Sequence, residues 1–230
     1  IYKQTYGLLN RFEAERPNEI WQSDHCLLDI NLIGINHQPV KPWLTIIIDD
    51  YSRAIAGYFL GFQPPSSMRI ATALRQAVWL KEESNWSICG IPEKFYSDCG
   101  SDFMSNHIDQ VSIDLKFEKI ETMPGEPQGK GKCERFFLTV QQQLLATLPG
   151  YSPEGCVNIS PVLTIEQLEQ RFKTWLLSEY LVEKHSEINM APKDRWMSFP
   201  FVPRIPDSLE QLDLLLMTLA KTRRVRRDGI

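Results

Sequence analysis

The chain has 230 residues, of which 43% are hydrophobic and 23% are charged, with a net charge of −4. This composition excludes a largely disordered chain and allows one substantial core plus a smaller appendage. No apolar run reaches the ~18 residues that span a bilayer, and the first residues lack the apolar middle of a signal peptide, so we expect a cytoplasmic protein.

The five cysteines are odd in number and never form a C-x-x-C pair. This pattern predicts neither a disulfide framework nor a zinc site, and reduced thiols are expected.

Charge is distributed unevenly, because five of the 25 Lys and Arg residues lie in KTRRVRR at 221–227. Residues 1–220 hold 20 basic against 28 acidic residues, a net charge of −8. A body this acidic would bind nucleic acid weakly by itself, so we expect basic DNA-binding parts elsewhere in a longer protein.

The sequence from residue 21 to residue 62 predicts three strands. The stretch WQSDHCLLDINLI at 21–33 alternates and places Asp24 in an apolar row, whereas WLTIIID at 43–49 is an unbroken apolar run typical of a covered strand. A turn at DYSR leads to a third strand at 54–62. We expect these three strands to be antiparallel neighbours.

Helices and strands then alternate. Ser66 and Ser67 are candidate caps of a helix that extends to about Glu82, and a short strand KFYS at 94–97 ends at Asp98. Helical spacing predicts a helix over 104–115, followed by a brief strand at 117–120.

A glycine-rich loop at 121–131 precedes the next helix, whose first turn carries Glu134. At 100° per residue this helix has one apolar stripe, made of Cys133, Phe137, Val140, Leu144 and Leu148. Glu134 is expected about 60° from the centre of the stripe, at the border of the buried face, with Arg135 nearly opposite.

The remaining residues predict an α-rich tail. It has a helix over 164–183, a loop HSEINMAPKDRW at 185–196, a proline-rich connector and a last helix beginning near Asp207. The order of elements is that of an α/β fold with a ribonuclease H-like mixed five-stranded sheet flanked by helices and a C-terminal α-helical extension, although element order alone leaves several other α/β folds open. We divide the chain into an N-terminal linker or helix at 1–17, a ribonuclease H-like core at 18–150 and the extension at 151–230.

Three acids lie at element boundaries or on an inward face of these elements. Asp24 is on the first strand, Asp98 ends the fourth and Glu134 begins a helix. Three converging carboxylates would repel one another unless cations were bound between them. Mg²⁺ prefers such oxygen ligands, and two ions ~3.5 to 4 Å apart form the recurrent clamp for phosphoryl displacement. We therefore predict a magnesium site, and we expect Mn²⁺ to substitute.

Spacing alone is weak evidence, because acids make up 29 of the 230 residues. The surrounding sequence is more specific. WQSDH, IIIDDYSRAIAGY, FYSDCGSDF and PQGKGKCERFF resemble, in that order, the blocks of the DDE transposases and retroviral integrases, with 35 residues between Asp98 and Glu134. ERFFLTVQQQLLATLPGY, HSEINMAPKDRW and LDLLLMTLAKTRRVRRDGI most resemble the TnsB and TniA branch, which is related to the bacteriophage Mu transposase. The resemblance spans residues 16–230.

The resemblance implies the catalytic core of a bacterial DNA transposase, which cuts transposon 3′ ends and joins them to target DNA. Asp24, Asp98 and Glu134 would be the catalytic residues and would hold two metal ions, one activating the nucleophile and the other stabilising the leaving 3′ oxygen. The implied partners are DNA, further copies of the chain assembled on DNA, and an AAA+ ATPase regulator. The branch also has end-binding domains before this core and a small β-barrel after it, which we expect to be missing here.

Basic residues near the site are candidates for DNA contacts. Lys130, Lys132 and Arg135 border the loop and would contact the DNA backbone, as would Arg223 and Arg224 in the terminal basic run. For each group a solvated surface role is the alternative.

Other interpretations remain open. Asp24 and Asp98 could be hydrogen-bonded structural acids, and Glu134 could simply favour the helix dipole. Asp49 and Asp50, at a hairpin, are interpreted as solvated turn acids, and Asp29 and Asp102 as surface or capping residues. For the whole chain, the alternative functions are a ribonuclease H-like nuclease that only hydrolyses DNA, and a noncatalytic DNA-binding assembly module.

Overall fold

The computed structural model describes residues 13–97, 106–121, 131–154 and 160–217. Five strands form one mixed sheet in the order β5-β4-β1-β6-β7. They are β1 (Ile20–Leu27), β4 (Trp43–Asp49), β5 (Ile55–Gly61), β6 (Lys94–Ser97) and β7 (Glu118–Glu121). A second, two-stranded sheet of β2 (Leu32–Ile33) and β3 (Pro39–Val40) encloses the turn η1 (Ile35–His37).

The direction of the strands confirms the prediction from the first half of the chain. β1 pairs antiparallel with β4, and β4 pairs antiparallel with β5. β6 is parallel to β1 on the other side, and β7 is parallel to β6. The central strand β1 is therefore flanked on both sides.

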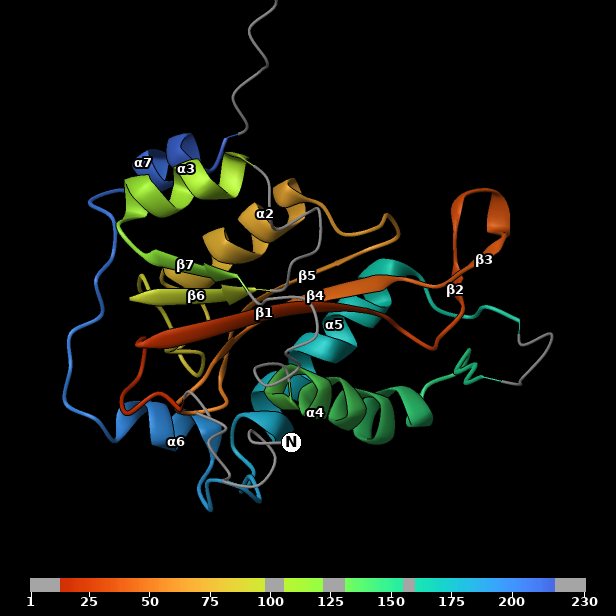
Figure 1. Cartoon of the computed structure of the whole chain (residues 1–230). Coiled ribbons are helices and arrows are strands. Elements are labelled where there is room, and N and C mark those ends of the chain that lie inside the picture. Colours follow the sequence, from red (N-terminus) through yellow and green to blue (C-terminus); the bar gives the residue numbers. More distant parts are fainter. Residues whose placement is uncertain (1–12, 98–105, 122–130, 155–159, 218–230) are drawn as a thin grey trace, which may run out of the picture.

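Helices cover both faces of the sheet (Figure 1). On one face lie α2 (Ser67–Val78), α3 (Asn106–Leu115) and α7 (Leu209–Leu216). On the other lie α4 (Gly131–Thr139), α5 (Ile165–Trp175) and α6 (Pro192–Met197). The predicted mixed five-stranded sheet flanked by helices is thus confirmed.

Helix α2 packs close to the sheet because β5 has glycine where the two elements meet. A Cβ atom on Gly57 would lie 2.4 Å from the backbone oxygen of Ala73, so a side chain there would push the helix away. The helix ends at Val78, four residues earlier than predicted, because Trp79 has an extended backbone. The Lys81 ammonium donates to the Ala77 carbonyl at 3.0 Å and so satisfies part of the last turn.

Helices α4 and α5 each continue as a π-helical segment. α4 passes into η3 (Val140–Leu144) and then into the 3₁₀ turn η4 (Leu145–Thr147), while α5 passes into η5 (Leu176–Tyr180). The start of α5 is fixed by a capping box, in which Thr164 and Gln167 each bond the other's backbone N–H. The last five residues of the predicted loop at 185–196 belong to the short helix α6, with Pro192 at its start as the helical first turn favours.

One hydrophobic core joins the strands to the helices that follow residue 150. Phe136 of α4 has its ring 4.8 Å from the ring of Tyr180 and 6.1 Å from that of Trp175 (centroid to centroid). Phe172 completes the bridge to the sheet, with its ring 4.8 Å from that of Tyr58 on β5. The predicted boundary at residue 150 stays a prediction, and the core runs across it.

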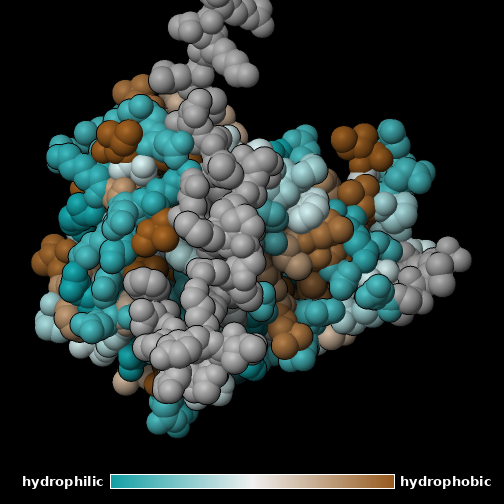
Figure 2. All heavy atoms as spheres, viewed as in Figure 1, coloured by the Kyte–Doolittle hydropathy of each residue, from teal (hydrophilic) through white to brown (hydrophobic). Residues whose placement is uncertain are grey.

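On the face drawn in Figure 2, hydrophobic side chains lie in several separate patches among hydrophilic ones. Among the helices that the structure describes, none is long and apolar enough to cross a membrane.

Candidate active site

Asp24 lies near the middle of the central strand. It pairs with Ile46 on β4, and its neighbour Ser23 donates a hydrogen bond to the Ile46 carbonyl at 2.9 Å. Residues 20–23 of β1 are buried, whereas Asp24 is half-buried. The strand thus leaves the covered part of the core at the position of the predicted acid.

Strand β6 leads toward the second predicted acid. Its ladder with β1 pairs Ile20 with Lys94, Trp21 with Phe95 and Gln22 with Tyr96. The strand ends at Ser97. Asp98 lies outside the described residues, as do Asp102 and Lys130.

Glu134 lies in the first turn of α4 and is exposed. Arg135 is exposed beside it. The helix buries Phe136, which is 1% exposed, whereas Phe137 of the predicted stripe is only partly buried. The buried face is therefore rotated from the predicted one, and Glu134 lies farther from its centre than the sequence indicated.

The residues just before Glu134 are fixed to the sheet. Cys133 is 1% exposed, and its Sγ lies 3.9 Å from Oε1 of Gln22 on β1. The Lys132 ammonium forms a 2.5 Å ion pair with Oδ1 of Asp50. Burial lowers the pKa of Lys132, an effect that Asp50 only partly offsets. The predicted DNA contact of Lys132 stays a prediction, and the structure gives this ammonium an internal partner.

The interpretation of Asp49 and Asp50 as solvated turn acids is wrong. Both are 0% exposed. Asp49 accepts from the backbone N–H of Asn18 and Ser52 and from the Ser52 hydroxyl, at 2.8, 2.9 and 2.5 Å. A sequence signal existed, since both acids directly follow an unbroken apolar strand and Ser52 supplies a donor three residues after Asp49.

The same turn is tied to the segment after α5. Arg53 is 8% exposed, and its guanidinium donates to the Asp50 carbonyl and to Glu187. The Tyr180 hydroxyl donates to the Arg53 carbonyl at 2.8 Å, and burial raises the pKa of Tyr180. Asp29, predicted as a surface or capping acid, forms a 2.8 Å ion pair with Lys41 at about one-third exposure.

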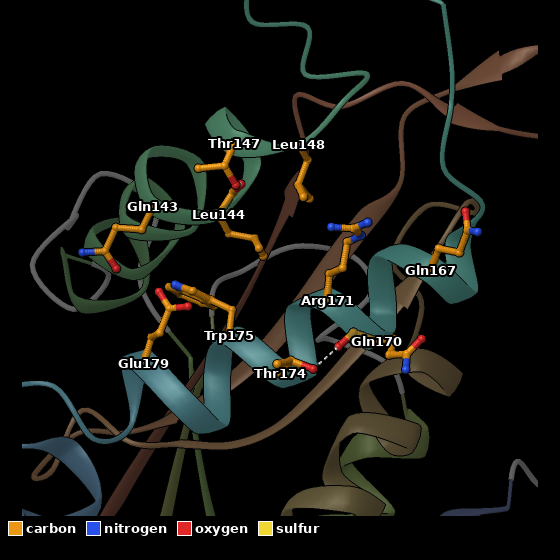
Figure 3. Close-up of a pocket in the computed structure, with 10 residues that line it drawn as sticks. All are labelled: Gln143, Leu144, Thr147, Leu148, Gln167, Gln170, Arg171, Thr174, Trp175 and Glu179. Carbon is orange, nitrogen blue, oxygen red and sulfur yellow. Dashed lines mark hydrogen bonds between the residues drawn. The ribbon is translucent and has the colours of Figure 1, made fainter.

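A groove that the sequence did not predict opens farther along α4. Its volume is about 590 Å³, and it lies between the end of the α4 helix with its continuation and the α5 helix with its continuation (Figure 3). Its lining combines the apolar side chains of Leu144, Leu148 and Trp175 with polar side chains, namely Gln143, Thr147, Gln167, Gln170, Arg171, Thr174 and Glu179. With one acid and one base, this lining does not resemble a carboxylate site.

The donor chemistry of the predicted site suits a hard cation. Asp24 and Glu134 offer carboxylate oxygens on two elements that the Gln22 and Cys133 contact holds together, and such ligands fit Mg²⁺ or Mn²⁺. Among the described residues, no three His, Cys, Asp or Glu side chains are grouped to hold a metal ion. Because Asp98 is not among them, the predicted triad is not tested.

Comparison with known proteins gives a consistent result. Residues 22–150 match the model of the TnsB C-terminal domain family. The chain is 48% identical over 229 residues to the transposase for transposon Tn552 of Staphylococcus aureus, covering 100% of this chain and 48% of that protein. It is 26% identical over 219 residues to the transposon Tn7 transposition protein TnsB of Escherichia coli, covering 86% and 31%. The chain thus spans about half or less of these curated relatives.

Solved structures with a similar fold include a chain of a viral intasome and an integrase catalytic core domain. One chain of a simian T-cell lymphotropic virus intasome, in complex with PP2A regulatory subunit B56 gamma, aligns with a TM-score of 0.60 and 16% identity, covering 85% of this chain and 60% of that one. The HTLV-2 integrase catalytic core domain in complex with magnesium aligns with a TM-score of 0.53 and 16% identity, covering 79% and 98%. The likeness confirms the predicted ribonuclease H-like fold.

Proposed function

Since the chain belongs to the TnsB C-terminal domain family within the DDE transposases and integrases, we propose that it is the catalytic core of a DNA transposase. In this proposal Asp24, Asp98 and Glu134 hold two divalent cations, Mg²⁺ or Mn²⁺, and the reaction is cleavage at transposon 3′ ends followed by strand transfer into target DNA.

The convergence of three segments supports this proposal. Gln22 pairs with Tyr96 in the parallel ladder of β1 and β6, and each predicted acid follows its paired residue by two positions. The described end of β6 therefore lies beside the part of β1 that directly precedes Asp24. The contact of Cys133 with Gln22 holds the first turn of α4, and with it Glu134, over the same strand.

The chemistry follows from what these side chains can do. When bound, divalent cations would activate the attacking water or 3′ hydroxyl and stabilise the leaving oxygen. The carboxylates would hold the cations at a fixed position on the sheet, where the cations would bind the scissile phosphate. Because Glu134 is exposed, a DNA strand could reach this position. Arg135, exposed next to Glu134, would contact the DNA backbone, as would Lys130, Arg223 and Arg224.

Partners follow from the same proposal. The relatives are named as a transposase and a transposition protein, and one structural neighbour is part of an intasome. We extend to this chain binding of transposon ends and target DNA, assembly of several copies on DNA, regulation by an AAA+ ATPase, and action in the cytoplasm.

A strand-joining assay tests the proposal. A transposase carrying this chain is given a transposon end with a precut 3′ hydroxyl, target DNA and Mg²⁺, and joined product is measured. We expect joining that is lost in Asp24→Asn, Asp98→Asn and Glu134→Gln, because each change removes a metal ligand while barely altering size.

The two alternatives give different results in the same assay. A hydrolytic nuclease would cut the DNA but yield no joined product from the precut end. An assembly module would bind DNA and support transposition equally well with Asp98→Asn. Either result would overturn the proposal.

A further inference from the structure

Asp50 is a fully buried carboxylate that binds three separate parts of the chain. Its Oδ1 accepts from Nε2 of Gln22 and from Nζ of Lys132, each at 2.5 Å. Its Oδ2 accepts from the backbone N–H of Ala14 at 2.8 Å. These donors lie on β1, in the first turn of α4 and in the segment before β1.

The Asp50 contacts are costly to break. The Asp50 side chain is 0% exposed and that of Lys132 is 14% exposed, so water does not compensate either charge when its partner is removed. Gln22 is 5% exposed and its amide is used at both ends, because Nε2 donates to Asp50 while Oε1 faces the Cys133 thiol. A change in the relative position of Asp50, Lys132 and Gln22 would therefore leave buried polar groups without partners.

This cluster lies directly behind the predicted active site. Lys132 and Cys133 are the two residues before Glu134 in α4, and Gln22 is two residues before Asp24 in β1. Asp50 accepts hydrogen bonds from both elements, and the Cys133 thiol also contacts Gln22 directly. The position of Glu134 relative to Asp24 thus depends in part on how Asp50 holds the two elements.

We propose that Asp50 is a positioning residue of the active site, which sets the separation of Asp24 and Glu134 by holding β1 and α4 through Gln22 and Lys132. The inference rests on the proposed function in one respect, namely that the separation of Asp24 and Glu134 matters because the two carboxylates bind divalent cations. Asp50 itself touches neither cation nor DNA in this proposal.

The test compares two disrupting variants with a matched control in the 230-residue chain. Asp50→Asn and Lys132→Met each remove one charge of the pair. Asp49→Asn is the control, since Asp49 is equally buried in the same turn but its partners, Asn18 and Ser52, lie away from α4. Melting curves identify a temperature at which all variants are folded.

Two measurements are made at that temperature. Hydrogen–deuterium exchange follows amides of α4, with α3 as an internal reference. Mn²⁺ affinity is measured by titration calorimetry or by electron paramagnetic resonance of free Mn²⁺. We expect Asp50→Asn and Lys132→Met to speed exchange in the first turns of α4 about tenfold relative to α3, and to weaken Mn²⁺ binding roughly 10- to 100-fold.

The control separates positioning from general stability. Asp49→Asn is expected to lower the melting temperature without either effect. Exchange in α4 that is the same in all three variants would overturn the inference, as would unchanged Mn²⁺ affinity in Asp50→Asn and Lys132→Met. Absence of Mn²⁺ binding by the unmodified chain would instead count against the proposed function, and the exchange measurement would still decide whether Asp50 positions α4.

Discussion

The turn after β4 and the junction of β1 with α4 each hold two acidic residues, but the protein treats them in opposite ways. Asp49 and Asp50 are fully buried, and each accepts at least three hydrogen bonds. Asp24 is half-buried and Glu134 is exposed. Acids whose oxygens are enclosed by donors serve the fold, whereas acids at an open edge remain able to bind a ligand from solution.

The largest expected effect is the loss of strand joining when an acid at the open edge, Glu134, is replaced. Glu134→Gln in a transposase carrying this chain should lower the rate of strand joining at least ~1,000-fold, equivalent to about 4 kcal/mol of transition-state stabilisation. Its free energy of unfolding should change by less than about 0.5 kcal/mol, because the side chain is exposed. Joining assays and denaturant titration measure the two quantities. Near-normal joining would show that Glu134 is not a metal ligand.

The next effect contrasts the two faces of α4. Phe136→Ala should lower the free energy of unfolding by about 3–5 kcal/mol, because it removes a ring packed against Phe172, Trp175 and Tyr180. Phe137→Ala, at a partly buried position, is the matched control and should cost clearly less. Urea titration of both variants checks the order. Equal losses would restore the apolar stripe expected from the sequence.

A pH experiment tests how the buried acids are accommodated. Burial raises the pKa of Asp49 to about 6, although hydrogen bonds from Ser52 and Asn18 act in the opposite direction. The folded state therefore binds a proton at a higher pH than the unfolded state, whose carboxyl titrates near 3.8. The resulting stability is present below the unfolded pKa and is lost as the pH rises through about 6, to a total of roughly 3 kcal/mol.

The measurement is the free energy of unfolding between pH 4 and pH 7 for the unmodified chain and for Asp49→Asn. The unmodified chain should lose stability relative to the variant as the pH rises. Parallel curves would mean that the carboxyl is ionised throughout, with its three donors outweighing burial.

The smallest expected effect comes from an ion pair that is solvated, in contrast to that of Asp50 and Lys132. Arg75 of α2 and Asp213 of α7 form a pair whose side chains are 44% and 42% exposed. A double-mutant cycle with Arg75→Ala and Asp213→Ala should give a coupling below about 1 kcal/mol. The coupling should shrink further in 1 M salt. A large coupling energy that does not depend on salt would show that the exposure of an ion pair does not predict its contribution to stability in this protein.

The elements predicted best from sequence are those whose pattern is complete within a short stretch. The apolar run at 43–49 gave β4 with the same bounds, and the helix predicted to begin at about residue 164 corresponds to α5, which begins at Ile165. The antiparallel order of the first three strands also followed from local signals. Asp24 and Glu134 were recognisable as candidate ligands because the motifs around them, WQSDH and PQGKGKCERFF, resemble those of the DDE transposases and integrases.

The errors arose where a residue's environment comes from distant chain segments. Periodicity favoured Phe137 over Phe136, because it cannot register the aromatic side chains of α5 and η5 that pack around Phe136. The helix α2 was predicted to extend to Glu82, but Trp79 is extended and Lys81 donates to the Ala77 carbonyl and to the later Ile88 carbonyl. The contact with Ile88 is not visible in the helical pattern itself.

The sequence by itself determined most of the element types and the strand order of the first half, and it named Asp24, Asp98 and Glu134 as candidate metal ligands. Only the tertiary structure decided that Asp50 is a buried hub, because its donors at Ala14, Gln22 and Lys132 are 36, 28 and 82 residues away along the chain. An acidic residue at the end of a strand can be exposed to water or buried. It is buried when folding brings hydrogen-bond donors from distant segments to its carboxylate in place of water.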